Sequence, residues 1–129
     1  MIKFTASLEP VAFNRVMANG KRRYNSAEYT EFKNGLGYFA LQAMSGREPM
    51  TGAIKLHADF YKCKPKKITS RNWGDLDNHL KSVLDALNGI AYLDDAQVVS
   101  ISGTKNFGEP HINIELEEIL NWRKSNEIY

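Results

Sequence analysis

The sequence has few of the features that mark disulfide-stabilised, zinc-bound or membrane proteins. Cys63 is the only cysteine among 129 residues, which excludes an internal disulfide and any cysteine-based zinc cluster. No apolar run approaches the roughly 20 residues that span a bilayer, and the alternating N-terminus does not have the apolar core of a signal peptide. We therefore expect a cytoplasmic protein with no membrane partner.

Several common catalytic motifs are also missing. The glycines match neither P-loop nor dinucleotide-binding spacing, and no Gly-x-Ser-x-Gly elbow is present. An EF-hand loop beginning at Asp75 would need glycine at its sixth position and glutamate at its twelfth, and neither stands there. His57, His79 and His111 are scattered and form no zinc-type pair, so each is expected at the surface or on a strand.

Charge is distributed unevenly along the chain, although its net value is only +2. Residues 1–74 carry 13 Lys/Arg and 5 Asp/Glu, a net of +8, whereas residues 75–129 carry 4 and 10, a net of −6. A basic half is compatible with a simple solvated face, and it also suits a polyanionic partner. When a basic half occurs together with an acidic cluster of metal-binding type, nucleic acid is the favoured partner, because Lys and Arg would hold its phosphates.

Hydrophobic periodicity predicts one α+β domain over residues 1–129, in which helices cover one face of a small mixed sheet. The predicted elements are, in order, a strand over 2–8, a loop or wide hairpin over 11–25, a helix over 26–45 capped by Gly46, a strand over 53–62, a basic loop over 63–74, a helix from 75 or 77 to 88, a strand over 98–105, a strand over 111–116, and a short C-terminal helix or tail. The last two strands are expected to form a hairpin.

Two tight acidic pairs flank the second helix. Asp75 and Asp77 stand at its entry, and Asp94 and Asp95 come just before a strand. Carboxylate oxygens are the ligands that Mg²⁺ prefers, and a strand beside the helix would bring a third carboxylate to the first two. The alternative is structural, with Asp75 and Asp77 as helix caps and the second pair as a turn.

Lys81 lies one helical turn after Asp77. It could form an i,i+4 ion pair with Asp77 or Asp85, or it could contact a scissile phosphate and stabilise charge in the transition state.

The segment DLDNHLKSVLDALNGIAYLDDAQVV, residues 75–99, resembles the signature of the RusA family of Holliday junction resolvases, which phages and prophages often carry. The shared pattern is Asp-x-Asp-Asn-x-x-Lys, then a helix with Asp-Ala-Leu, then Asp-Asp-x-Gln-Val. The flanking segments are similar more loosely, over about residues 2–116.

The resemblance implies a small RusA-like α+β homodimer that cuts four-way or other branched DNA with Mg²⁺ or Mn²⁺ in recombination and repair. On the matching positions, Asp75, Asp77 and Asp95 would bind metal and Lys81 would be catalytic, with Asn78 and Asp94 in support. The basic residues expected to track DNA phosphates are Arg15, Lys21, Arg22, Arg23, Lys64, Lys66, Lys67 and Arg71.

Two other readings stay open. One is a non-catalytic DNA-binding module whose acids are structural, and the other is an RNA nuclease. A pure binding module has no need of Lys81 together with three correctly spaced aspartates, which favours the nuclease.

Overall fold

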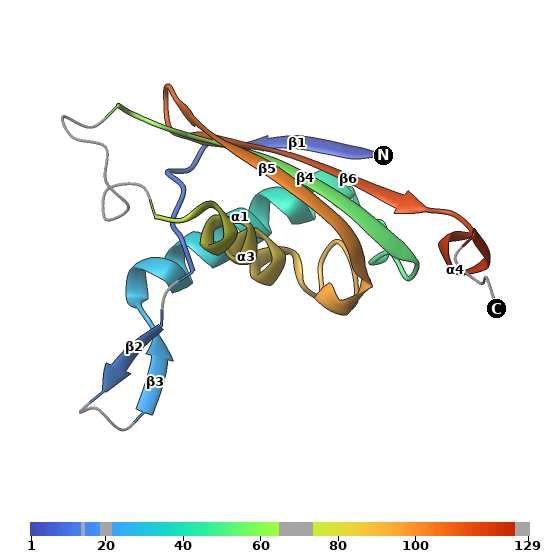
Figure 1. Ribbon diagram of the computed structural model, residues 1–129, viewed down its shortest axis with the longest axis horizontal. Coiled ribbons are helices and arrows are strands. Elements are labelled where there is room, and N and C mark those ends of the chain that lie inside the picture. The colour runs from blue at the N-terminus through green and yellow to red at the C-terminus, as the bar shows by residue number, and fades with distance from the viewer. Residues whose placement is uncertain (14, 19–21, 65–73, 126–129) are drawn as a thin grey trace.

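A computed structural model of the chain describes residues 1–13, 15–18, 22–64 and 74–125. Four strands form a mixed sheet in the order β1-β6-β4-β5, and two form a separate antiparallel ribbon, β2-β3. Figure 1 shows α1 and α3 on the same side of the sheet, which confirms the predicted α+β arrangement. The elements are β1 (Ile2–Ala6), β2 (Arg15–Ala18), β3 (Arg22–Asn25), α1 (Ala27–Met44), β4 (Ala53–Lys62), α3 (Leu76–Leu87), the 3-10 helix η1 (Asp95–Gln97), β5 (Val98–Phe107), β6 (His111–Ile119) and α4 (Trp122–Ser125).

Helix α1 begins and ends with clear local signals. The Ser26 hydroxyl oxygen accepts a 3.1 Å hydrogen bond from the Tyr29 N–H and caps the first turn. The helix ends at Ser45, which adopts the left-handed conformation with φ 52°, one residue before the expected cap at Gly46. Gly46 continues the left-handed turn at φ 79°. Within the described ranges, the helices are all too short or too polar to cross a membrane.

Strands β4 and β6 form the centre of the sheet. The inward side chains of β4 alternate along the strand and are fully buried, and those of β6 pack beside them at 1% exposure or less. Strand β4 has the bounds that its alternating pattern predicts. The buried positions are Ile54, Leu56, Ala58, Phe60, Ile112, Ile114 and Leu116.

The expected hairpin between the last two strands is wrong. Strand β5 runs parallel to β4 along one side, and β6 runs antiparallel to β4 along the other. The connection between them passes the end of β4, where the Gly108 N–H donates a 2.9 Å hydrogen bond to the Lys62 carbonyl. Strand β6 takes the inner position because its apolar side chains are buried there, whereas the largely exposed residues of β5 suit a sheet edge.

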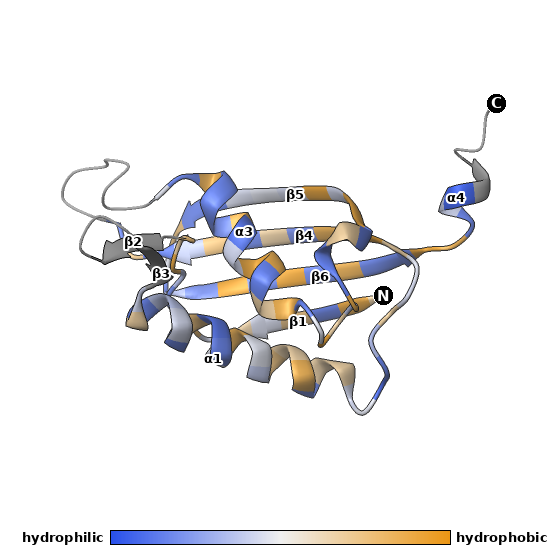
Figure 2. Ribbon diagram, turned by 90° about the horizontal axis from the view of Figure 1, so that it is seen from below, coloured by the Kyte–Doolittle hydropathy of each residue, from blue (hydrophilic) through white to orange (hydrophobic). Residues whose placement is uncertain are grey.

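Helix α3 approaches β5 closely at Gly103. A Cβ atom at this position would lie 2.8 Å from the Ala58 carbonyl oxygen and 2.8 Å from a Leu80 methyl group, so only glycine fits. Farther along β5, the Lys105 ammonium donates a 3.1 Å hydrogen bond to the Gly74 carbonyl, just before α3 begins. Figure 2 shows the helix lying over the sheet on the face that α1 also covers. The start of α3 is thus fixed beside the edge strand.

Two of the three histidines lie where the sequence places them, and one does not. His57 is on β4 and His111 is on β6, as expected for strand residues. His79 is on α3 and fully buried, with its ring centroid 5.1 Å from that of Phe60. The buried face of α3 is wider than its leucine stripe, because it also includes His79, Ser82 and Ala86.

Candidate active site

The first acidic pair lies at the exposed start of α3. Asp75 is the N-cap residue, with φ −79° and ψ 145°, but its carboxylate makes no capping hydrogen bond. Asp77 accepts a 2.9 Å hydrogen bond from the Asn78 N–H through one carboxylate oxygen. Asp75 therefore occupies the cap position without the side-chain bond that a structural cap would make, which leaves its carboxylate open to a ligand.

The two residues of the second acidic pair, Asp94 and Asp95, have different surroundings. Asp94 is the N-cap of η1, and its Oδ1 accepts a 3.3 Å hydrogen bond from the Ala96 N–H. Asp95 is the first residue of that 3-10 helix, and its carboxyl forms a side-chain hydrogen bond with Asp94. Asp94 thus supports the turn that presents Asp95.

Gln97 ties this turn to the rest of the molecule. Its Oε1 accepts hydrogen bonds of 2.9 Å from the N–H groups of both Leu93 and Asp94, which completes a capping box. Its Nε2 donates to the carbonyls of Met50, at 2.8 Å, and Gly52, at 2.9 Å. One amide side chain therefore fixes the acidic turn against the segment that leads into β4.

Asp95 has the strongest electrostatic perturbation among the site carboxylates. Burial raises its pKa above the ordinary value of 3.8, and the hydrogen bond and negative charge of Asp94 and the charge of Asp85 raise it further. The Lys81 ammonium partly opposes them. These influences place the Asp95 side chain within electrostatic range of Lys81 and Asp85 on α3. The carboxyl also keeps its proton to a higher pH than an exposed aspartate does.

Lys81 lies between a carboxylate and an aromatic ring. Of the two ion-pair partners that spacing allows, Asp85 is the one used, with Lys81 Nζ 3.5 Å from Asp85 Oδ1. The ammonium is also 4.8 Å from the ring centroid of Phe13. The Tyr29 hydroxyl donates a 2.6 Å hydrogen bond to the other oxygen of Asp85. Lys81 remains 46% exposed and can still reach a bound anion.

The carboxylates suit Mg²⁺ chemically, but they are not gathered into a closed cage. Among the described residues, no three His, Cys, Asp or Glu side chains lie close enough to hold a metal ion together. Mg²⁺ usually takes only one or two protein carboxylates, and water and substrate phosphate complete its shell. Asp75, Asp77 and Asp95 therefore stay a predicted ligand set. The contact that the fold provides is the Lys81–Asp85 ion pair, whose two charges also act on the Asp95 carboxyl.

The predicted DNA-binding residues lie in several places. Arg15 is on β2, and Arg22 and Arg23 are on β3, in the ribbon that extends away from the sheet in Figure 1. Lys64 is exposed just after β4. The remaining four lie outside the described residues: Lys21, Lys66, Lys67 and Arg71.

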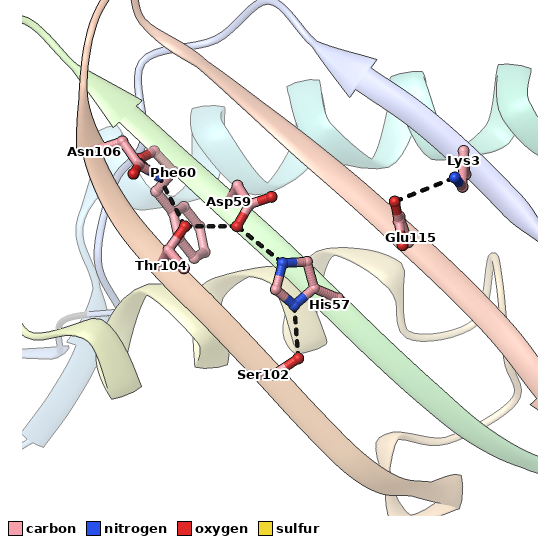
Figure 3. Close-up of polar contacts among 8 residues, drawn as sticks. All are labelled: Lys3, His57, Asp59, Phe60, Ser102, Thr104, Asn106 and Glu115. Atoms are coloured by element: carbon pink, nitrogen blue, oxygen red, sulfur yellow. Dashed lines mark hydrogen bonds and ion pairs between the residues drawn. The ribbon is translucent and has the colours of Figure 1, made fainter.

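The opposite face of the sheet carries a separate polar network, drawn in Figure 3. His57 lies 2.6 Å from the Ser102 hydroxyl and 2.8 Å from Asp59, and Thr104 donates to the same Asp59 oxygen. These residues are register neighbours on β4 and β5, and the helices lie behind the sheet in this view. The network links strands on the outer face, away from Lys81.

Sequence reasoning missed three residues of the site. Phe13 and Tyr29 contact Lys81 and Asp85 from other parts of the chain, and Gln97 fixes the acidic turn. Tyr29 carries a weak signal, as a polar-tipped residue on the apolar face of its helix. Gln97 carries a stronger one, because it is part of the Asp-Asp-x-Gln motif. Phe13 lies in an irregular segment and carries none.

Comparison with known proteins shows a family and a bacterial protein to which this chain is similar. The family described as Endodeoxyribonuclease RusA matches residues 8–117, which include α3, η1 and every residue of the site above. An uncharacterized protein of Bacillus subtilis (strain 168), YqaN, is 31% identical over 140 aligned positions, covering 92% of this chain and 96% of that protein.

Proposed function

This chain belongs to the RusA endodeoxyribonuclease family, and from that membership we propose that it is a metal-dependent endonuclease that resolves four-way DNA junctions by paired nicks. The observation that carries the proposal is Lys81, which pairs with Asp85 at 3.5 Å and lies close enough to Asp95 for its charge to act on that carboxyl. It stands on the helix whose first turn carries Asp75 and Asp77. A cation next to several carboxylates is an arrangement that suits phosphodiester hydrolysis. We place this activity in the cytoplasm, in recombination and repair.

Each residue then has a distinct task. Asp75, Asp77 and Asp95 are the proposed ligands of Mg²⁺ or Mn²⁺, which when bound supplies Lewis-acid polarisation of the phosphate and a more acidic water. Asp95 must lose its proton before it can act as a ligand, and its raised pKa makes that step pH-dependent. Lys81 would place its ammonium against a phosphate oxygen, where negative charge increases in the transition state.

The reaction is a hydrolysis. Water forms a bond to phosphorus and gives up a proton, and the bond from phosphorus to the 3′ oxygen breaks. That oxygen takes up a proton, so the product is a nick with a 3′-hydroxyl and a 5′-phosphate. Resolution of a junction needs two such nicks. We propose a two-fold homodimer, because it would present one site to each of two strands of a substrate with matching symmetry.

A cleavage assay tests the proposal. A labelled four-way junction is incubated with the protein in Mg²⁺, in Mn²⁺ and in EDTA, beside a linear duplex of the same arm sequence and an RNA duplex. We expect paired nicks in the junction with either cation and none in EDTA. Cleavage of the RNA duplex in preference to the junction would support an RNA nuclease, and absence of any cutting would remove the proposal.

The second candidate is a DNA-binding module that does not cut. Two observations favour it: Asp94 has a structural role, and within the described part of the chain no three ligating side chains converge. Such a module would bind the junction by electrophoretic shift equally well with and without divalent cation, and would leave it intact. The cleavage assay and a binding assay on one preparation therefore separate the two candidates.

A further inference from the structure

We propose that Asp85 and Tyr29 are positioning residues that hold the Lys81 ammonium in a fixed place for the reaction. The inference rests on the proposed function, since it concerns the lysine assigned to the scissile phosphate. It adds two residues from different helices to the machinery, neither of which is a proposed metal ligand. It is based on the two oxygens of the Asp85 carboxylate, one of which contacts Tyr29 and the other Lys81.

The Asp85 carboxylate joins two separate donors. Its Oδ2 accepts the 2.6 Å hydrogen bond from the Tyr29 hydroxyl, and its Oδ1 faces Lys81 Nζ at 3.5 Å. Tyr29 is fully buried near the start of α1, whereas Asp85 and Lys81 are 24% and 46% exposed on α3. Burial therefore decreases outwards along the chain of contacts, from an anchored hydroxyl through the carboxylate to an ammonium that solvent and substrate can reach.

An ordinary i,i+4 ion pair on a helix surface would not orient Lys81 in this way. Such pairs are weak, and both partners keep much of their rotamer freedom in water. Here one partner is fixed by a group on another helix, 56 residues away in the sequence. A carboxylate that is held at one oxygen presents its second oxygen in a defined direction, so the lysine meets an oriented acceptor.

Phe13 supports the lysine on a second side. Its ring centroid is 4.8 Å from Lys81 Nζ and 5.4 Å from the centroid of Tyr29, in an edge-to-face contact at 85°. Its backbone N–H donates a 2.9 Å hydrogen bond to the Asn78 carbonyl, which attaches this segment to α3. Lys81, Asp85, Tyr29 and Phe13 thus form a closed ring of contacts drawn from three segments of the chain.

The test removes the two supports one at a time. Tyr29→Phe deletes only the hydroxyl and keeps the buried ring, and Asp85→Asn keeps the shape but removes the charge. Single-turnover cleavage of a four-way junction is measured at saturating enzyme, and junction binding is measured separately without divalent cation. We expect each variant to cleave about ten- to a hundredfold more slowly, because small displacements of a catalytic group have effects of that size.

Binding distinguishes a positioning role from a general loss of structure. Tyr29→Phe should bind the junction within about twofold of wild type, since the charge is unchanged. Matched controls are Tyr38→Phe, which removes an exposed hydroxyl from the same helix, and Asp59→Asn, which removes a carboxylate from the outer sheet face. Both controls should cleave at the wild-type rate. Circular dichroism melts confirm that each variant is folded.

A Lys81→Ala background gives the sharpest comparison. If Tyr29 and Asp85 act through Lys81, neither substitution should slow the residual cleavage of Lys81→Ala any further. Wild-type cleavage rates in Tyr29→Phe and Asp85→Asn would overturn the inference. An equal slowing in the presence and absence of Lys81 would overturn it as well.

A readout that does not depend on cleavage separates this inference from the proposed function. Side-chain ¹³C relaxation at the lysine Cε positions measures the order of Lys81, with Lys3 as reference because it forms a 3.4 Å surface ion pair with Glu115. Lys81 should be more ordered than Lys3 in wild type and should become as mobile as Lys3 in Tyr29→Phe. Equal mobility in wild type would overturn the inference, whereas an ordered Lys81 in a protein that cuts nothing would remove the proposed nuclease alone.

Discussion

Among individual residues, the four aspartates of the two acidic pairs differ in what surrounds them. The Asp94 carboxylate caps η1 by accepting a hydrogen bond from the Ala96 N–H. The Asp77 carboxylate accepts a hydrogen bond from the neighbouring Asn78 N–H. Asp75 makes no capping bond, and Asp95 is influenced by the charges of α3. Residues of one type in one motif therefore have separable structural and chemical roles, which substitution can measure one at a time.

Substitution of Asp77 tests the predicted metal role. Asp77→Asn should lower the cleavage rate at least about a hundredfold and leave junction binding intact, because it removes a ligand charge without weakening any phosphate contact. The amide oxygen of asparagine can still accept the Asn78 N–H, so the free energy of unfolding should change by less than about 0.5 kcal/mol. Cleavage and denaturant titrations on the same variant check both statements, and loss of folding would favour the structural-cap alternative.

The raised pKa of Asp95 predicts how its contribution to stability changes with pH. Its folded-state pKa lies above the ordinary value of 3.8, so folding favours the protonated carboxyl. That contribution is fully present below the unfolded pKa and is lost as pH rises through the folded pKa. In EDTA, Asp95→Asn should therefore be more stable than wild type at pH 7.5. Its advantage should shrink towards pH 4 in urea titrations, and an advantage that grew with acidity would contradict the assignment.

Among the elements, the close approach of α3 to β5 is what places Lys81 and Asp85. Gly103→Ala would put a Cβ 2.8 Å from a backbone carbonyl oxygen that cannot move aside easily. We expect a loss of about 1–3 kcal/mol in the free energy of unfolding, typical of overpacking, together with slower cleavage as α3 shifts.

Gly35→Ala is the matched control for this substitution. Gly35 lies in the middle of α1, and its added Cβ would meet only the two Leu8 methyl groups, at 3.4 and 3.5 Å. Alanine is favoured over glycine in a helix, so this variant should gain about 0.5–1 kcal/mol. Chemical denaturation of the pair measures both changes, and equal effects from the two alanines would show that packing against β5 is not the cause.

Local periodicity predicts the elements better than it predicts their neighbours. The bounds of α1, β4 and α3 follow from caps and alternation, which are properties of short segments. The strands that pair with β6 do not follow from such local properties. The neighbour in sequence, β5, competes with the distant strands β1 and β4, which bury more of β6. The same division applies to the site. Spacing allows Lys81 to pair with either Asp77 or Asp85, one helical turn away on each side, and the structure selects Asp85. Tyr29 reaches Asp85 across 56 residues, which spacing cannot predict.

At the scale of the whole molecule, the uneven charge predicts how DNA binding depends on salt. Each phosphate contact should contribute about 0.9 to the slope of log affinity against log salt concentration for duplex DNA. If exposed Lys64 touches a phosphate, Lys64→Ala should reduce that slope by about one, measured between 50 and 200 mM salt. Lys3→Ala is the control, because Lys3 pairs with Glu115 on the outer sheet face. An equal change in both variants would indicate a general charge effect.

The position of β6 also affects how the protein can be made. Strand β1, which precedes the other described strands in the chain, pairs with β6 from Ile2 against Leu116 to Ala6 against Ile112. Strand β4 uses the same β6 along its other side. A growing chain therefore keeps β1 without this partner until β6 has been synthesised. The strands therefore cannot pair in the order in which they are synthesised. A chain that is cut short before His111 lacks β6, the strand that joins β1 to β4 in the sheet.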